Sequence, residues 1–270
     1  NYDASIGHYQ LSGHPYYRQI EYIIILFMTL GGINFIVHYQ ALKGNLKKYI
    51  DNIEMRYFWQ IIIYVTTIIF IGKTVLDTQT IMNLEENFRK ILFQVVSVMT
   101  TTGFGTESIG GAFFPAVAKQ LFLLLMLIGG CVGSTSGGIK VIRVAILNKL
   151  FIREIKKIYL PKHAVIPVTI DKQTVEIEEI LKVAALVFAW IFLILIGSGI
   201  TAVFSDLSAF QSISGMLSAV GNIGPFYFSV SKMASLSPVI KITYIIGMLA
   251  GRLEILPVFL IFFRNVWKYN

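Results

Sequence analysis

Apolar blocks about long enough to cross a bilayer constrain this chain more than any other feature of its sequence. They cover about residues 17–39, 57–75, 113–147, 180–204 and 238–263. A membrane-spanning helix needs about 20 mostly apolar residues to cross a hydrocarbon core about 30 Å thick. Charged residues make up 14% of the chain, against roughly 25% in soluble domains. The sequence therefore predicts an all-α membrane protein.

The order of the blocks repeats. A long apolar block, a short helix, a glycine-containing turn and another long block occur in residues 57–147 and again in residues 178–263. The first short helix, residues 84–99, covers only part of the hydrocarbon core at about 1.5 Å per residue. Aligning Gly103 with Gly221 gives an offset of 118, and the starts of the two repeats, residues 57 and 178, give 121. An internal repeat on this scale is typical of membrane transport proteins.

The two turns predict cation sites. Backbone that is not helical leaves carbonyl groups that lipid cannot satisfy, so it must be buried in protein or face water and ions. Carbonyl oxygens pointing into one conduit can replace the hydration shell of a cation. Glycine permits the backbone angles that such a turn needs. We therefore expect extended backbone at Gly103 and Gly221, with a hydroxyl of Thr101 or Thr102 as a further ligand.

The run of residues 129–138 holds five glycines, two serines and one threonine. A phosphate-binding loop requires lysine directly after its second glycine, and Ile139 follows Gly138 here, so a nucleotide site is excluded. Glycines four residues apart could serve helix packing instead. The density of weak helix formers favours an unwound loop inside the apolar block.

Arg252 lies within the last apolar block. A charge at the bilayer centre costs at least about 2.5–3.5 kcal/mol, so it should face the protein interior or a water-filled path. Glu254 is two residues away and lies on another helix face, which makes direct pairing poor. Arg252 follows Gly221 by 31 residues and Gly133 follows Gly103 by 30, so the arginine and the unwound loop should lie at one depth. We expect them to gate ion flow.

Charge is concentrated in two linkers, residues 42–56 and 148–172, and gives the chain a net charge of +8. Basic loops mark the cytoplasmic side of a membrane protein, and no aromatic-interleaved basic face for nucleic acid is present. Cys131 is the single cysteine, which excludes a disulfide within the chain, and the four histidines lack the spacing of metal ligands.

Four segments carry a family resemblance. Residues 100–104 (TTTGF) and 221–225 (GNIGP) resemble the third and fourth filters of the TrkH/KtrB potassium transporters of the Trk/Ktr/HKT superfamily. Residues 129–140 resemble their intramembrane loop, and residues 251–254 the arginine-bearing stretch of their last helix. The resemblance implies a potassium-channel-like architecture of repeated M1–pore helix–filter–M2 units. Phe226 departs from it, because a further glycine is expected there.

The resemblance also implies site residues. The third filter would be formed by Thr101, Thr102, Gly103 and Phe104, and the fourth by Ala219, Val220, Gly221 and Asn222. The gate would be formed by Gly129, Gly130, Gly133, Ser134, Thr135, Ser136, Gly137, Gly138 and Arg252. K+ would be the transported ion, and no cofactor is expected in this chain.

The resemblance divides the chain into four parts: a filter-exit loop and inner helix of a second repeat (1–40), a third repeat (41–147), a cytoplasmic linker (148–177) and a fourth repeat (178–270). We expect the chain to begin just after a second filter, before the sequence DASIG at residues 3–7, so that missing repeats or another chain must complete the pore. The resemblance implies that the protein would be a multi-pass homodimer in the cytoplasmic membrane. A cytosolic nucleotide-binding subunit of the TrkA/KtrA type would contact its basic linkers.

Other functions remain open. A secondary transporter with broken helices would use the turns to hold a substrate, and a relative permeable to Na+ would differ at the two filters that are not in this sequence. A membrane enzyme lacks support, because the sequence offers no carboxylate pair, metal cluster or activated nucleophile within its apolar blocks.

Overall fold

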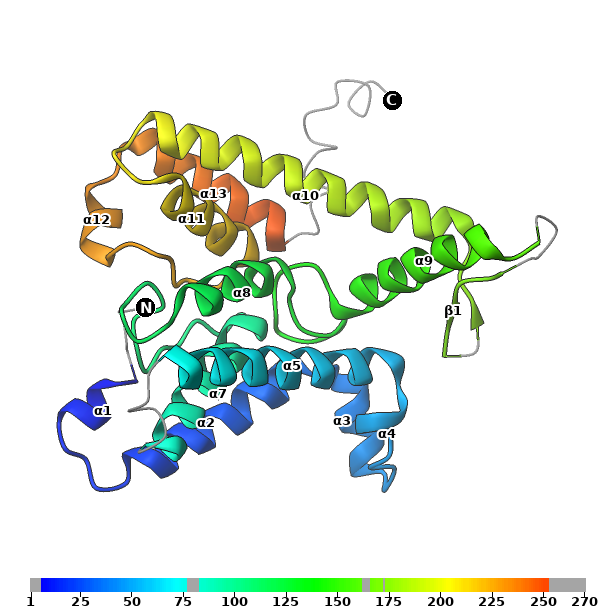
Figure 1. Cartoon of the computed structure of the whole chain (residues 1–270), viewed down its shortest axis with the longest axis horizontal. Coiled ribbons are helices and arrows are strands. Elements are labelled where there is room, and N and C mark those ends of the chain that lie inside the picture. Colours follow the sequence, from blue (N-terminus) through cyan, green and yellow to red (C-terminus); the bar gives the residue numbers. More distant parts are fainter. Residues whose placement is uncertain (1–5, 77–82, 162–165, 172, 253–270) are drawn as a thin grey trace, which may run out of the picture.

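The computed structural model describes residues 6–76, 83–161, 166–171 and 173–252, and these residues are predominantly helical (Figure 1). The N-terminal part contains α1 (His8–Leu11), α2 (Tyr17–Gly32), α3 (Phe35–Leu42), α4 (Lys48–Asp51), α5 (Ile53–Leu76) and α7 (Leu84–Met99). The middle part contains α8 (Ala116–Leu127), α9 (Val141–Tyr159), β1 (Thr169–Ile170) and β2 (Gln173–Thr174). The C-terminal part contains α10 (Ile177–Val203), α11 (Ala209–Gly221), α12 (Val230–Ser235) and α13 (Pro238–Arg252).

Two of the described helices, α5 and α10, are long and apolar enough to cross a bilayer. They cover the predicted blocks 57–75 and 180–204. The block 17–39 differs from prediction, because it divides into α2 and α3, which are bent by 104°. Ile33 is extended, and the side chain of Asn34 accepts the backbone N–H of Ile36 at 2.8 Å. An asparagine N-cap after two glycines thus ends one helix and starts the next.

The helices form two groups joined by α8 (Figure 1). In one group α11 packs against both α10 and α13, and in the other α7 packs against both α2 and α5. Helix α8 contacts α5, α7 and α11, so it connects the groups. In each group, therefore, one helix that ends at a turn, α7 or α11, packs against two others.

Apolar side chains cover the outside of the long helices as well as the interior. On α10, Trp190 is buried, whereas Leu181, Phe188 and Leu195 are 63%, 71% and 60% exposed. These three residues are spaced seven apart and lie on one helix face. An exposed apolar stripe on a helix of membrane-spanning length is expected where lipid is the neighbour.

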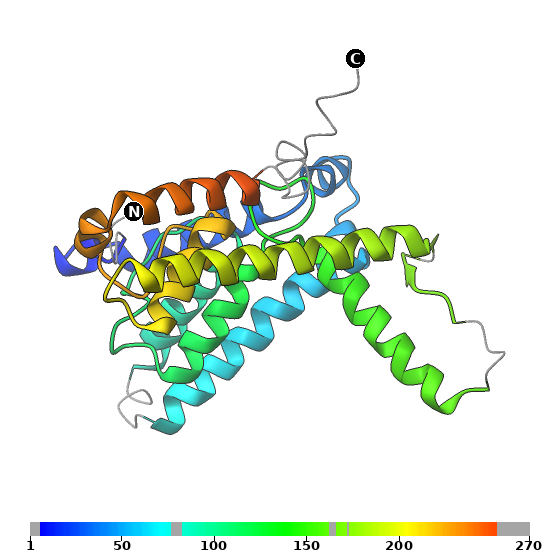
Figure 2. The same ribbon diagram turned by 90° about the horizontal axis from the view of Figure 1, so that it is seen from above.

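The linker between α9 and α10 ends in a small antiparallel hairpin. Strands β1 and β2 pair Thr169 with Thr174; residues 162–165 and 172 lie outside the described part. Helix α9 leads away from the other helices (Figure 2). The carboxylate of Asp171 accepts the backbone N–H of Ile53 at 3.0 Å. The hairpin therefore holds the start of α5.

A buried ion pair joins α2 to α7. The guanidinium of Arg89 contacts the carboxylate of Glu21, and both side chains are fully buried. The Nε atom of Arg89 also lies 2.8 Å from the carboxylate of Glu85. Removing one member of a buried pair leaves an uncompensated charge.

Replacing Glu21 with leucine should therefore destabilise the protein by about 3 kcal/mol, measured as a lower thermal midpoint in detergent. The double variant Glu21→Leu/Arg89→Leu should recover most of that loss, because no buried charge remains. Arg18→Ala is the matched control: its pair with Glu85 spans 3.8 Å at 58% side-chain exposure, and exposed pairs contribute about 0–1 kcal/mol. Equal losses from Glu21→Leu and Arg18→Ala would contradict this account of the pair.

Candidate functional site

The first turn follows α7 directly. Thr101 has φ 53° and Gly103 has φ 78°, both in the left-handed region. The backbone N–H of Thr102 bonds the carbonyl of Ser97 at 3.0 Å, and the hydroxyl of Ser97 donates to the carbonyl of Phe104 at 2.6 Å. No hydrogen bond between described residues ends on the carbonyl oxygens of Thr101, Thr102 or Gly103. The backbone at Gly103 is therefore not helical, but it is left-handed and not extended as predicted.

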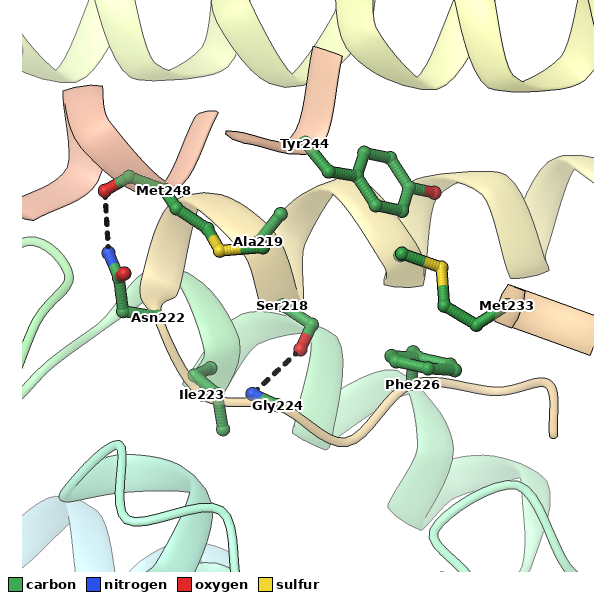
Figure 3. A pocket seen from close by; sticks show the side chains of 10 residues that line it. Ser218, Ala219, Asn222, Ile223, Gly224, Phe226, Met233, Tyr244 and Met248 are labelled. Atoms are coloured by element: carbon green, nitrogen blue, oxygen red, sulfur yellow. Dashed lines mark hydrogen bonds between the residues drawn. The ribbon is translucent and has the colours of Figure 1, made fainter. Parts of the chain in front are cut away.

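The second turn follows α11, whose start carries a capping box of Ser208 and Gln211. Asn222 ends the helix with φ 55°, and Gly224 has φ 112°. The backbone N–H of Ile223 bonds the carbonyl of Ser218 at 3.0 Å, and the N–H of Gly224 bonds its hydroxyl at 3.0 Å (Figure 3). The irregular backbone therefore begins at Asn222.

Three of the predicted filter residues lie elsewhere. Ala219, Val220 and Gly221 form the last helical turn of α11, so the prediction of extended backbone at Gly221 is wrong. Glycine is required at 221 for another reason: a Cβ there would lie 2.7 Å from the carbonyl oxygen of Met126 in α8. Close helix packing, rather than backbone freedom, explains this glycine.

The geometry of the two turns gives the register of the repeat. The carbonyl oxygens of Ser97 and Ser218 each accept the backbone N–H of the fifth residue after them. Thr101 and Asn222 are both left-handed, and Gly103 and Gly224 both have positive φ. Each pair is separated by 121 residues, so the offset of 118 is wrong. This spacing is visible in the sequence as glycine at 103 and 224, but not at the left-handed position, because Asn222 readily adopts positive φ and the β-branched Thr101 rarely does. The spacing also equals the offset between the starts of the two repeats.

The second turn borders a cavity of about 210 Å³ that Figure 3 shows from close by. Its walls are mainly apolar and come from α11, α13 and the turn itself, with Phe226 and Met233 at one end. The side-chain amide of Asn222 donates to the carbonyl of Met248 in α13 at 3.0 Å. This bond ties the second turn to α13.

The glycine-rich run separates α8 from α9 and is not helical, which confirms the predicted unwound loop; residues 129–138 are called the intramembrane loop below. Its ends meet: the N–H of Gly129 bonds the carbonyl of Ile139 at 2.9 Å. Inside it, the hydroxyl of Ser136 accepts the N–H of Gly130 at 2.8 Å, and the hydroxyl of Ser134 donates to the carbonyl of Cys131 at 2.6 Å. Side-chain hydroxyls thus replace part of the missing helical hydrogen bonding.

The intramembrane loop reaches both turns. The N–H of Gly137 donates to the hydroxyl of Thr101 at 2.9 Å, so that hydroxyl faces the loop. A Cβ on Gly137 would lie 2.5 Å from the carbonyl oxygen of Gly221, at the end of α11, and 3.4 Å from the Cβ of Asn222 in the second turn. The loop also bonds the end of α2, because the N–H of Cys131 donates to the carbonyl of Gly32 at 2.9 Å.

Arg252 contacts the loop, as its spacing predicts. A guanidinium nitrogen donates to the carbonyl of Thr135 at 2.9 Å, although 117 residues separate the two. Lys140, Arg143 and Arg252 line the same cavity of about 290 Å³ beside the loop. The predicted proximity of Arg252 to the loop therefore agrees with this contact. Glu254, the alternative partner, lies outside the described residues.

Gly129 allows the loop to close. A Cβ there would overlap the carbonyl oxygen of Gly137, and overpacking of this kind costs about 1–3 kcal/mol. Gly129→Ala should therefore lower the thermal midpoint of the detergent-solubilised protein. Gly199→Ala in α10 is the control, because no heavy atom lies within 4 Å of its Cβ position. A midpoint for Gly129→Ala that matches this control would contradict the observed closure.

These features define a predominantly helical membrane protein of the transporter class. They are broken helices, short helices that end in left-handed turns, and helices of spanning length with apolar outer faces. A family model described as TrkH, a cation transport protein, matches residues 2–269. The chain therefore belongs to the TrkH family.

Individual relatives agree. The Trk system potassium uptake protein TrkH of Salmonella typhimurium is 33% identical over 279 residues, which cover 99% of this chain and 53% of that protein. An uncharacterized cation transporter of Methanocaldococcus jannaschii is 35% identical over 269 residues, covering 98% of this chain and 51% of the relative. The crystal structure of the potassium transporter TrkH from Vibrio parahaemolyticus has a TM-score of 0.83 at 26% identity and covers 99% of this chain and 55% of that one. The chain spans about half the length of the curated relatives it matches.

Proposed function

We propose that this chain forms part of a K+ uptake pore in the cytoplasmic membrane. The carbonyl groups of Thr101, Thr102 and Gly103 would line it on one side, and those of Asn222, Ile223 and Gly224 on the other. Carbonyl oxygens can replace the hydration shell of K+. Phe104 and Pro225 would follow these residues toward the outer mouth. The assignment keeps the predicted third filter and moves the fourth by three residues, so that Ala219, Val220 and Gly221 support it from α11.

The observation that supports this proposal most is the repeated turn geometry. Two turns 121 residues apart share a serine bond, a left-handed residue and a positive-φ glycine. Their carbonyl oxygens accept no hydrogen bond from another described residue. Carbonyl oxygens that the protein leaves open in the same way at two related positions can serve as ligands for a cation.

The gate in this proposal is the intramembrane loop with Arg252. The loop lies against both turns, through Gly137, and it accepts a hydrogen bond from Arg252 at Thr135. A guanidinium next to the path repels K+, and the loop carbonyl that holds it fixes the charge there. Movement of the loop would open the path.

The complete pore needs more than the two turns of this chain. We assign residues 1–40 to the inner part of a second repeat, 41–147 to a third, 148–177 to a cytoplasmic linker and 178–270 to a fourth. The remaining filters would come from preceding repeats or another chain, in a multi-pass homodimer. The basic linkers would contact a cytosolic nucleotide-binding subunit of the TrkA/KtrA type.

Ion flux tests the function. Proteoliposomes that hold the complete membrane protein should take up K+ (followed as 86Rb+) down a gradient, with Na+ uptake at least tenfold slower. Equal Na+ and K+ fluxes would identify a Na+-permeable relative. Uptake that saturates and requires a coupled substrate would favour a broken-helix transporter, a function that the 104° bend between α2 and α3 also fits.

A further inference from the structure

A carboxylate outside the predicted site contacts the intramembrane loop. Glu54 lies in the first turn of α5 and is 5% exposed. One of its oxygens accepts the backbone N–H of Val132 at 2.7 Å, although 78 residues separate the two. A charge-assisted bond of this kind is stronger than one between neutral groups. The loop is therefore held by an acid on α5 as well as by Arg252 on α13.

The helix that follows the loop begins near the same carboxylate. Helix α9 packs against α5, and Ile142, in its first turn, lies close to Glu54. N–H groups in a first helical turn have no partner within the helix, and the helix dipole favours an anion there. The start of α9 therefore favours a carboxylate at this place beside the loop.

The backbone that carries Glu54 is itself fixed. The side chain of Asn52 accepts the N–H of Glu54 at 2.8 Å. The carboxylate of Asp171, in the turn between β1 and β2, accepts the N–H of Ile53 at 3.0 Å. The N–H groups of the first two residues of α5 therefore both have acceptors, so Glu54 projects from a fixed helix end.

The contact on the other side of the loop is weaker. Arg252 is exposed and makes one hydrogen bond to the loop, at the carbonyl of Thr135. Breaking it returns a guanidinium to water, whereas releasing Val132 would leave the Glu54 carboxylate buried with fewer partners. Movement of the loop should therefore break the Arg252 contact and keep the Glu54 contact.

We propose that Glu54 is a positioning residue for the gate: its carboxylate fixes the Val132 side of the intramembrane loop to α5, and the loop moves about this point when Arg252 releases Thr135. The inference rests on the proposed function in one respect: the loop is a gate only if the chain conducts ions. The anchoring itself is a statement about structure, and it can be tested without transport.

Cys131 supplies the probe. It is the single cysteine of the chain, it precedes Val132, and it is fully buried, with its sulfur 3.9 Å from that of Met55 in α5. A loop that leaves α5 exposes this thiol. The rate at which a small maleimide modifies Cys131 in the complete membrane protein therefore measures the anchoring directly.

Glu54→Ala should raise the rate of Cys131 modification at least tenfold. Glu54→Gln should keep it within threefold of the parent, because the amide oxygen can still accept the N–H of Val132. Glu54→Met fills the space without a strong acceptor and should behave like Glu54→Ala; it also replaces Glu54→Ala if that variant fails to assemble. Glu178→Gln, which removes an exposed acid from the first turn of α10, is the matched control and should match the parent.

Arg252→Ala separates the two contacts. It should raise ion leak while Cys131 modification stays within threefold, because the loop remains anchored at Glu54. Parent-like modification in both Glu54→Ala and Glu54→Met would overturn the proposal. So would a tenfold rise in Arg252→Ala, which would put the fixed point on α13. Absence of K+ flux in the parent would refute the proposed function and leave the modification result to decide the anchoring alone.

Discussion

Replacement of Gly103 with alanine is expected to lower K+ uptake at least tenfold while the protein remains assembled. Gly103 has φ 78°, and a residue with a Cβ pays about 1–2 kcal/mol to stay in this region. The backbone can avoid that cost by rotating the adjoining peptides, which turns the carbonyls of Thr102 and Gly103 away from the proposed ion path. The measurement is the initial rate of 86Rb+ uptake into proteoliposomes.

Two other glycines provide the control for strain. Gly13 has φ 70° and Gly44 has φ 94°, and neither has a heavy atom within 4 Å of its Cβ position. Gly13→Ala and Gly44→Ala bear a similar backbone cost outside the proposed pore and should take up K+ at the parent rate. Normal uptake by Gly103→Ala, with normal assembly, would exclude the first turn from the ion path.

Removal of the Arg252 side chain should raise K+ leak at least tenfold. In the proposed gate this cation repels K+ and is fixed by its 2.9 Å hydrogen bond to Thr135. Alanine removes both the charge and the bond, so the barrier falls and the loop is freed at that end. Leak is measured as 86Rb+ efflux from proteoliposomes in the absence of any cytosolic partner.

Two matched variants test whether the leak depends on the positive charge at position 252 or on the loss of any cation from α13. Arg252→Lys keeps a cation that can reach a carbonyl and should leak less than Arg252→Ala. Lys241→Ala removes a cation from the other end of α13, where it bonds the carbonyl of Ala234, and should leave efflux unchanged. An efflux from Arg252→Ala equal to that of the parent would remove this arginine from the gate.

Local patterns in the sequence predicted the helices well. The short helix at 84–99 begins and ends where predicted, because charged residues open it and Thr100 to Gly103 form a poor continuation of a helix. The unwound loop at 129–138 was predicted from its density of glycine, serine and threonine. In both places the signal lies in adjacent residues, so no knowledge of the surroundings was needed.

The register of the second turn could not be read from glycine alone. Glycine serves close packing at 221 and left-handed backbone at 224, and the sequence letter is the same for both. Only the backbone angles distinguish the two uses. The long block at 17–39 failed for a related reason: Asn34 is compatible with a helix interior, and its role as an N-cap depends on the loop at Gly133 that packs against it.

Contacts between distant segments were predicted only where the internal repeat related the spacing of one segment to that of another. The spacing from the turns predicted that Arg252 lies beside the loop, and its hydrogen bond to Thr135 agrees with that prediction. Nothing comparable linked Glu54 to Val132, because a buried carboxylate at a helix start reads as an ordinary first-turn acid. The partner comes from 78 residues away and is a backbone N–H, which carries no sequence signal.

The position of bound ions tests the central claim most directly. An experimental structure of the complete membrane protein in Tl+ or Rb+ should have ion density within about 3 Å of the carbonyl oxygens of both turns, at Thr102–Gly103 and at Ile223–Gly224. Exchange for Na+ should remove or weaken that density. Ordered ions elsewhere, with these carbonyls hydrogen-bonded to protein or facing lipid, would contradict the account.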